Sequence, residues 1–237
     1  MLRWPRSLIT TVADQDLPLP GISSNMIIVV TAFLLASIGR QALQLIIQYA
    51  SRRFGWTIAF ASFLISFKGA VNLAALLVVL PWLATRLGRL MIPVLKDLRI
   101  TQGNAALFAV GAVLMAAAAR PGVFIAGVGV LSLGSGFYSA LRSVATALVT
   151  PEQVGVLNTA VAMAQGVGDL VPGPVLVVAF RRGIVLGGVW TGLPYGVAAL
   201  LFMGATCLVC GIRIPKQAAV GVPEAEDGVD EPLESCA

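Results

Sequence analysis

Apolar residues in this chain form long runs, which are separated by segments rich in Gly, Pro and Arg. A helix needs about 20 mostly apolar residues to cross the hydrocarbon core of a bilayer. Six runs have about that length, and they predict transmembrane helices over residues 26–48, 58–80, 101–119, 123–141, 156–179 and 187–209. Because most of the segments between these runs are short, consecutive helices are expected to be antiparallel neighbours in one compact bundle.

Composition supports an all-α integral membrane protein whose main surroundings are a lipid bilayer. Of the 237 residues, 58% are hydrophobic and 11% are charged, whereas soluble domains have about 45–50% apolar and about 25% charged residues. The net charge of +5 comes from basic residues that stand singly or in pairs, so no nucleic-acid partner is expected. Histidine is absent, which excludes His-based zinc sites and Ser–His catalysis, and we expect no metal, no cofactor and no enzymatic activity.

Neither the three cysteines nor the two ends of the chain indicate a reactive site. Cys207 and Cys210 form a CxxC inside an apolar run, where packing against lipid or core is expected rather than a redox role. The first twenty residues lack the apolar stretch of a signal peptide. Residues 214–237 contain Cys236 and six acidic residues with few large apolar ones, so an acidic, disordered tail is predicted.

The distribution of Lys and Arg predicts the orientation, because cytoplasmic loops carry an excess of these residues. An even number of spans places both termini on one side. That side would hold nine basic residues: Arg3, Arg6, Arg86, Arg89, Lys96, Arg99, Arg142, Arg213 and Lys216. The other side would hold five: Arg52, Arg53, Arg120, Arg181 and Arg182. Both termini are therefore predicted to be cytoplasmic, and the plasma membrane is the expected location.

Three ionisable side chains fall well inside the predicted spans: Arg40, Lys68 and Asp169. Each costs at least about 2.5–3.5 kcal/mol at the bilayer centre, so each needs a partner or a wet cavity. Lys68 and Asp169 lie near the middle of their spans, and Arg40 lies somewhat further along its own span. The three charges could share one layer, which predicts that Asp169 faces Lys68 or Arg40 across the interior. Two interpretations remain open: a structural ion pair that fixes helix packing, or a site for a substrate or coupling ion.

Polar residues recur on one side of the same three helices, at spacings of four, seven or eleven residues. They are Gln44 and Gln48 after Arg40, Asn72 after Lys68, and Asn158 and Gln165 before Asp169. Three polar stripes are expected to converge on a common interior. The candidate residues for binding a substrate or coupling ion are Arg40, Gln44, Lys68, Asn72, Gln165 and Asp169.

The segment around Asp169 reads "GVGDLVPGP". Gly166 and Gly168 are expected to let another helix approach closely. Pro172 and Pro174 lack an amide donor and predict a kink in the fifth span. A charge beside a kink in a glycine-lined helix indicates an element that faces the interior or a cavity.

The six spans divide into two groups of three, and the middle span of each group carries a central charge. An inverted three-plus-three repeat of this kind builds half of a major facilitator superfamily transporter. After the second span, the sequence "PWLATRLGR" resembles that superfamily's cytoplasmic loop motif, G-x-x-x-D-R-x-G-R. Arg86, Gly88 and Arg89 match the motif, whereas Pro81 and Thr85 replace its glycine and its acid. The lost acid removes a contact that the motif uses in conformational gating.

Longer stretches resemble the C-terminal half of filamentous-fungal members of the superfamily. Residues 45–73 resemble spans seven and eight, and residues 133–155 and 166–183 resemble spans ten and eleven. The resemblance implies a six-span bundle over 25–213, a preceding cytoplasmic linker over 1–24, and transport of a small solute by alternating access. It also implies a second six-span half as partner, which is either a missing N-terminal half or another copy of this chain.

Other membrane functions lack their motifs. A serine protease needs a histidine base, a nucleotide-driven pump needs a P-loop, and neither feature is present. The sequence also lacks channel-filter sequences and the three repeats of a mitochondrial carrier. The remaining alternative is a half that does not transport, either as a truncated gene product or as a subunit that acts only with a partner.

Overall fold

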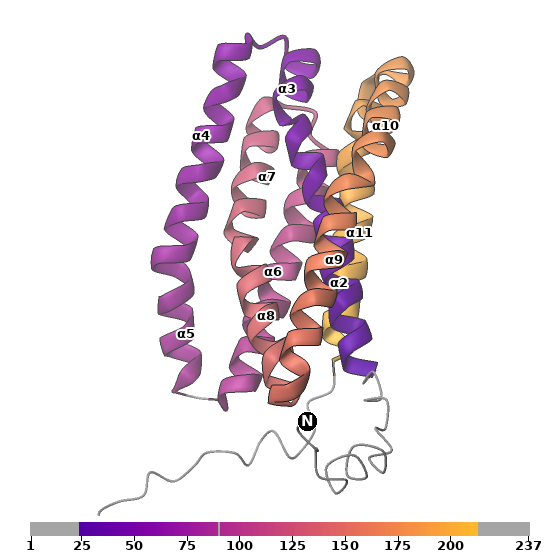
Figure 1. The fold of residues 1–237 in the computed structure, drawn as a ribbon. Coiled ribbons are helices and arrows are strands. Elements are labelled where there is room, and N and C mark those ends of the chain that lie inside the picture. Colours follow the sequence, from indigo (N-terminus) through magenta and orange to yellow (C-terminus); the bar gives the residue numbers. More distant parts are fainter. Residues whose placement is uncertain (1–23, 90, 213–237) are drawn as a thin grey trace, which may run out of the picture.

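The computed structural model describes residues 24–89 and 91–212, and these residues form helices without any strand. Six helical segments are long and apolar enough to cross a membrane: Asn25–Phe54, Ile58–Gly88, Pro93–Ala116, Pro121–Ala147, Pro151–Leu186 and Trp190–Cys210. The predicted all-α, six-span membrane fold is thereby confirmed. Successive spans run in opposite directions, so the first span begins and the last span ends at the same end of the bundle (Figure 1).

Most spans consist of more than one helix. The α-helices are α2 (Ser24–Gln41), α3 (Ile46–Phe54), α4 (Ile58–Ala74), α5 (Leu80–Gly88), α6 (Pro93–Ala116), α7 (Pro121–Leu133), α8 (Phe137–Ala147), α9 (Val154–Leu170), α10 (Pro172–Leu186) and α11 (Leu193–Cys210). Short 3-10 turns lie at Ala42–Leu45, Gly134–Gly136, Pro151–Gln153 and Gly188–Gly192, and a π-helical turn lies at Ala75–Val79.

The interruptions occur in the same order in the two groups of three spans. A 3-10 turn divides the first and the fourth span, at Ala42–Leu45 and Gly134–Gly136. The second span contains the π-helical turn, and the fifth is broken between α9 and α10. The third and sixth spans, α6 and α11, have no interruption within the helix. This parallel agrees with the grouping of the spans in threes.

Several predicted span boundaries were wrong by up to eight residues. The third span was predicted to begin at residue 101, but α6 begins at Pro93. Its first two turns carry Lys96, Asp97 and Arg99, which broke the apolar run in the sequence although the backbone is already helical. Helices that extend past the hydrocarbon core into the headgroup region end in such polar turns. Boundaries at the second, fourth and fifth spans shift outward for the same reason.

The centre of the bundle is formed by α6 and α11, with α7 and α2 packed on either side. Two glycines allow α6 and α7 to come very close. A Cβ added at Gly111 would lie 2.6 Å from the backbone nitrogen of Leu131, and one at Gly127 would lie 2.8 Å from the Met115 side chain. Small residues at a helix contact are a common device of membrane bundles, because they let backbones approach closely.

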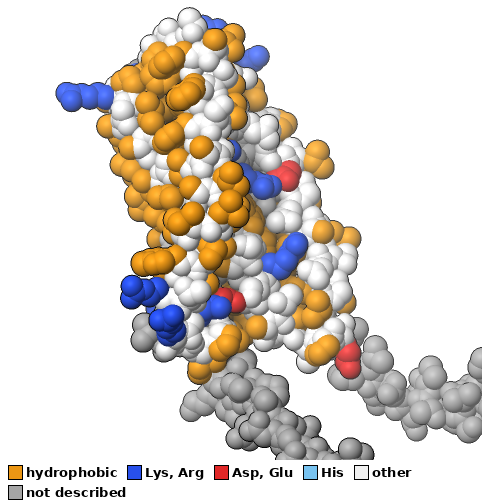
Figure 2. Space-filling model, turned by 90° about the vertical axis from the view of Figure 1, so that its left-hand side faces the viewer, with side chains coloured by type: hydrophobic (Ala, Val, Ile, Leu, Met, Phe, Trp, Pro, Cys, Tyr) orange, Lys and Arg blue, Asp and Glu red, His pale blue; other side chains and the backbone are white. Residues whose placement is uncertain are grey.

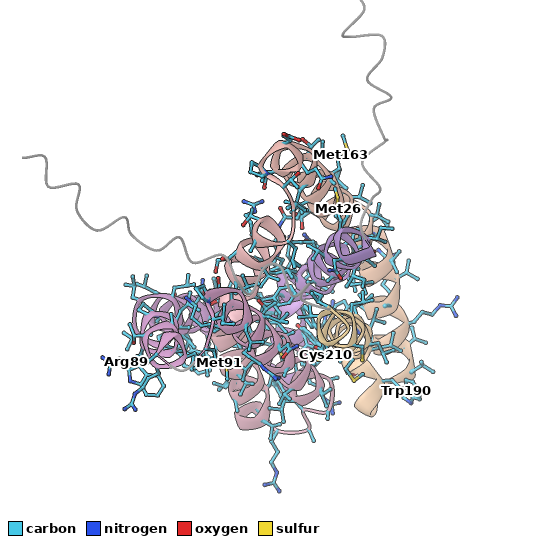
Figure 3. All side chains as sticks on the ribbon, turned by 90° about the horizontal axis from the view of Figure 1, so that it is seen from below. Met26, Arg89, Met91, Met163, Trp190 and Cys210 are labelled. Atoms are coloured by element: carbon cyan, nitrogen blue, oxygen red, sulfur yellow. The ribbon has the colours of Figure 1, made fainter. Side chains whose placement is uncertain are left out.

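Two spans are poorly covered by the rest of the bundle. Only 11% of the most apolar window of Ile58–Gly88 is buried, and only 22% of that of Pro151–Leu186. Seen from below, α4 and α5 lie at one edge of the bundle, and Arg89 and Trp190 lie at opposite edges (Figure 3). Cys207 and Cys210 are exposed on α11 and form no disulfide. The exposed apolar surface is consistent with surrounding lipid or a further protein partner.

Within the described residues, the basic side chains do not favour one end of the bundle. Five belong to each side of the predicted topology, because Arg3, Arg6, Arg213 and Lys216 lie outside the described residues. Residues 1–23 of the predicted linker over 1–24, the residue Cys236 and the acidic tail over 214–237 also lie outside them. The cytoplasmic orientation of the termini therefore stays a prediction.

Candidate functional site

Asp169 of α9 forms an ion pair with Arg40 of α2. The Arg40 Nη2 atom lies 3.1 Å from Asp169 Oδ1 and 3.3 Å from Oδ2. Each residue lies within one position of the midpoint of its span, Asn25–Phe54 or Pro151–Leu186. The two side chains are 45% and 41% exposed, so the pair sits at mid-depth on an open face and not in the packed interior. Figure 2 shows this hollowed face, with basic and acidic side chains meeting between apolar surfaces.

Two glutamines extend the ion pair into a network. The Gln41 side-chain amide donates a hydrogen bond of 2.6 Å to Asp169 Oδ1, and the Gln44 amide donates to Gln41 Oε1. Asp169 thus accepts hydrogen bonds from both Arg40 and Gln41, and hydrogen bonds between charged groups are stronger than those between neutral ones. Gln41 was not predicted as a site residue, although its position beside Arg40 in the sequence is the signal that could have found it.

Gly168 holds α9 close enough to α2 for these contacts. A Cβ at Gly168 would lie 2.6 Å from the Ser37 Cβ and 3.2 Å from the Leu34 carbonyl oxygen. The same expectation for Gly166 was wrong, because a Cβ there would meet no atom within 4 Å. Two residues correspond to about 200° around a helix, so the two glycines point to opposite sides of α9.

The fifth span is interrupted at Val171, between α9 and α10. Pro172 and Pro174 lack backbone N–H groups, so they cannot pair with the carbonyls of Gly168 and Leu170 one turn earlier. The interruption therefore lies two residues after Asp169, and it frees carbonyl oxygens on the turn that carries the acid.

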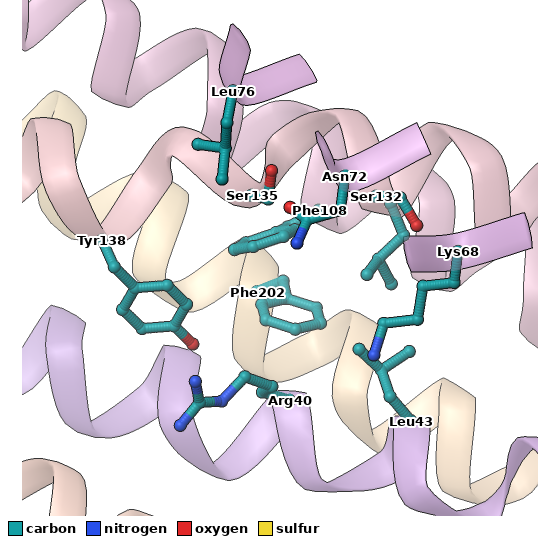
Figure 4. Close-up of a pocket in the computed structure, with 11 residues that line it drawn as sticks. Arg40, Leu43, Lys68, Asn72, Leu76, Phe108, Ser132, Ser135, Tyr138 and Phe202 are labelled. Carbon is teal, nitrogen blue, oxygen red and sulfur yellow. The ribbon is translucent and has the colours of Figure 1, made fainter. Parts of the chain in front are cut away.

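A cavity of about 280 Å³, called here the central cavity, lies beside the ion pair (Figure 4). Its polar lining consists of Arg40, Lys68, Asn72, Ser132, Ser135 and Tyr138. The side chains of Phe108 and Phe202 and three leucines complete the wall. The Arg40 guanidinium carbon lies 5.1 Å from the centre of the Tyr138 ring, a cation–π contact.

A second cavity of about 430 Å³, called here the side cavity, shares Arg40, Leu43 and Lys68 with the central cavity. Gln44 and Asp169 line the side cavity. The two cations therefore stand where the two cavities adjoin, and the Lys68 ammonium extends across the central cavity toward Leu43 (Figure 4).

The structure thus brings together five of the six predicted site residues: Arg40, Gln44, Lys68, Asn72 and Asp169. Gln165 is half-buried and lines neither cavity. Gln48 of the predicted Arg40 stripe lies with Arg52 and Arg181 in a different pocket. The stripe assumed one continuous α-helix, but the 3-10 turn at Ala42–Leu45 has three residues per turn and changes the direction of the later side chains.

Residues of the third, fourth and sixth spans in the cavity wall were not predicted. The fourth span contributes Ser132, Ser135 and Tyr138, at a spacing of three residues. Polar residues three apart in an apolar run were the available signal for these. Phe108 and Phe202 gave no signal, because an aromatic residue in a span is usually core or lipid-facing.

The loop motif lies at the end of α5 and in the residue that follows it. The Arg86 guanidinium carbon lies 5.6 Å from the Trp82 ring centre, and Gly88 faces the Lys96 side chain of α6. Among the described residues, neither Arg86 nor Arg89 forms an ion pair. Thr85, which replaces the acid of the motif, bonds back to the Trp82 carbonyl at 2.9 Å.

In the part of the chain that the structure describes, no group of three His, Cys, Asp or Glu residues is placed to hold a metal ion. No protein-family model matches the chain, and no solved structure gives a significant match.

Curated fungal proteins do match the chain over most of its length. An MFS-type transporter, avaK of Aspergillus versicolor, is 33% identical over 192 residues, or 80% of this chain. This chain is homologous to fungal major facilitator superfamily transporters. The MFS efflux pump atnC of Emericella nidulans is 32% identical over 81% of the chain, and the efflux pump ustT of Aspergillus flavus is 34% identical over 80%.

The matches span less than half of each relative. They cover 43% of avaK and 38% each of atnC and ustT. Six membrane-spanning helices fit one half of a superfamily transporter. The chain is therefore a multi-pass integral membrane protein related to transporters, and its size corresponds to part of them.

Proposed function

We propose that this chain is the C-terminal six-span half of a major facilitator superfamily transporter, and that it moves a small solute by alternating access together with a second six-span half. One observation carries the proposal: Arg40, Lys68 and Asp169 converge near mid-depth on an open face that adjoins two cavities. In such transporters the substrate site lies near the bilayer midplane, and one bundle rocks against the other around it.

The open face supports the need for a second half. If it faced lipid, the half-exposed Arg40, Asp169 and Gln44 would lie in hydrocarbon, where each unsatisfied polar group costs several kcal/mol. A second half would cover this face and enclose the cavities. We favour the N-terminal half of a longer transporter over another copy of this chain, because a copy would bring two Lys68 side chains without acidic partners together.

Two of the relatives are named efflux pumps, so we propose export from the cytoplasm across the plasma membrane, with both termini of the chain cytoplasmic. The domain division follows the same scheme, with a linker over 1–24, a membrane bundle over 25–213 and an acidic tail over 214–237. The candidate substrate or coupling-ion residues are Arg40, Gln44, Lys68, Asn72 and Asp169.

A second candidate function is that of a half that does not transport. The loop motif favours it, because Thr85 replaces the acid and neither Arg86 nor Arg89 has an ion-pair partner among the described residues. Such a chain would act only as a membrane subunit.

Reconstitution of the purified 237-residue chain tests these alternatives. Its mass is measured in nanodiscs, and solute uptake is measured in liposomes with the chain alone and with the chain fused to the part of avaK that it does not match. We expect uptake only from the fusion, and its loss in Asp169→Asn. Robust uptake by a demonstrated monomer would overturn the proposal. Uptake by a dimer would favour the self-associated form, and a fusion without uptake would favour the non-transporting subunit.

A further inference from the structure

The charges around the central cavity do not balance. Asp169 neutralises Arg40 through the ion pair at 3.1 Å. Lys68 lines the same cavity and, among the described residues, has no carboxylate within 4.0 Å. One positive charge therefore remains at the boundary of the two cavities. An ammonium group held in hydrocarbon without a counter-charge is unfavourable, so the cavity has a place for one negative charge.

Polar atoms without partners belong to residues that line the same cavity. The structure leaves five buried side-chain oxygen atoms unpaired in the described residues, and three of them belong to cavity residues: Asn72, Ser135 and Tyr138. The Tyr138 hydroxyl has the Ser37 hydroxyl nearby but no partner in hydrogen-bond geometry. A buried polar atom without a partner costs about 1–3 kcal/mol, and a ligand with hydrogen-bonding groups would remove that cost.

The apolar part of the wall combines two phenylalanine rings, tilted by 33° to each other, with three leucines. Phe108 and Phe202 are almost fully buried, and their ring centres lie 5.0 Å apart. Phe202 is held in place by Gly39, where an added Cβ would lie 2.9 Å from the ring. The Tyr138 ring lies on the same side of the cavity as Arg40 (Figure 4). Such a wall suits a planar ring of a ligand, because offset or edge contacts between aromatic rings are favourable.

We propose that the central cavity binds an organic monoanion with a planar aromatic body, with its anionic group at the Lys68 ammonium and its ring against Phe108 and Phe202. This rests on the proposed function, since it names the substrate class of the same site. A cationic ligand would meet Lys68 without a counter-charge, and a neutral ligand would leave Lys68 unpaired. The charge that remains at Lys68 therefore sets the selectivity.

Three naphthalene derivatives of nearly equal shape test the selectivity. They are 1-naphthoate, which is an anion, 1-naphthamide, which is neutral, and 1-naphthylmethylammonium, which is a cation. Binding to the full chain in phosphatidylcholine nanodiscs is measured by titration calorimetry, and the signal of empty nanodiscs is subtracted to remove partitioning into lipid. Lys68→Gln removes the charge with little change of size, and Arg120→Gln, at the start of α7 and away from the cavity, is the matched control.

We expect 1-naphthoate to bind about tenfold more tightly than 1-naphthamide, as one additional half-exposed charge pair provides, and the cation to bind more weakly still. In Lys68→Gln the preference should fall to within about twofold, while Arg120→Gln should retain it. If the wild-type chain bound 1-naphthamide or the naphthylmethylammonium cation as tightly as 1-naphthoate, or more tightly, this result alone would overturn the inference. So would the absence of naphthoate binding in a chain that unfolds cooperatively, or a preference that persists in Lys68→Gln.

Transport by the fused protein separates this inference from the proposed function. Uptake of neutral solutes without any preference for the naphthoate would retain the transporter and reject the anion site. Selective binding of 1-naphthoate without uptake of any solute would retain the anion site and reject the transporter.

Discussion

Gly168 is predicted to control the distance between α9 and α2, and through it the Arg40–Asp169 ion pair. In Gly168→Ala the new Cβ would lie 2.6 Å from the Ser37 Cβ and 3.2 Å from the Leu34 carbonyl oxygen. Carbon atoms in contact are normally about 3.5–4.0 Å apart, so the helices must separate by about 1 Å. Asp169 is the next residue, and its contact with Arg40 at 3.1 Å would lengthen to about 4 Å.

Gly166→Ala is the matched control, because a Cβ there would meet no atom within 4 Å. Both substitutions gain about 1 kcal/mol of helix propensity, so their difference isolates the helix contact. Overpacking of a close contact costs about 1–3 kcal/mol. Gly168→Ala is therefore expected to be less stable than Gly166→Ala by about 1–3 kcal/mol in the free energy of unfolding.

Reversible unfolding of the two variants in lipid bicelles, followed by steric trapping, measures this difference. A double-mutant cycle with Ser37→Gly adds a second test, since Ser37 carries the nearest atom. The two substitutions should compensate partly, because the Leu34 carbonyl remains. Equal stability of Gly168→Ala and Gly166→Ala, with no coupling to Ser37, would refute the proposed close approach of α9 and α2.

Three further predictions follow from packing, charge and topology. Gly111→Ala should destabilise the bundle by about 1–3 kcal/mol relative to Gly103→Ala on the same helix, because only Gly111 faces another backbone; equal melting temperatures would contradict this. Arg40→Ala and Asp169→Ala should each be less stable than the double variant, because each strands one charge; additive losses in chemical denaturation would count against the ion pair. Glycosylation acceptors should be modified at residue 53 and not at residue 220 if both termini are cytoplasmic, and the reverse pattern in microsomes would invert the topology.

The spans and the ion pair were predictable from the sequence for simple physical reasons. A run of about 20 apolar residues has the length and composition of a helix that crosses the hydrocarbon core of a bilayer. A charge in such a run needs a partner or a wet cavity, so the sequence predicted that Asp169 would face Lys68 or Arg40. The sequence alone left Lys68 and Arg40 as equal candidates for Asp169. Only the packing of α2 on α9 decides between them.

The cavity wall was not predictable in the same way. Phe108, Tyr138 and Phe202 come from three different spans, and their meeting depends on how α6, α8 and α11 cross. The prediction that Gln48 shares a face with Arg40 was wrong because a local 3-10 turn changes the direction of the later side chains. The prediction of a close helix contact at Gly166 was wrong because spacing alone does not say which side of α9 meets a neighbour. Sequence periodicity shows which residues share a face of a regular α-helix. It does not show where a 3-10 turn interrupts the helix or how neighbouring helices cross.

Cysteine labelling of the second span tests most directly whether the central cavity is a water-filled solute path rather than a structural lock. Asn72→Cys lies in the cavity wall, and Leu77→Cys, 67% exposed on the same span, is on an apolar surface. Cys207, Cys210 and Cys236 are first replaced by Ser in the fused protein. In sealed membranes, an anionic methanethiosulfonate reagent is expected to label Asn72→Cys, with protection by 1-naphthoate, and to leave Leu77→Cys unlabelled. An unreactive Asn72→Cys in a folded protein, or labelling of Leu77→Cys alone, would contradict a solute path at Arg40, Lys68 and Asp169.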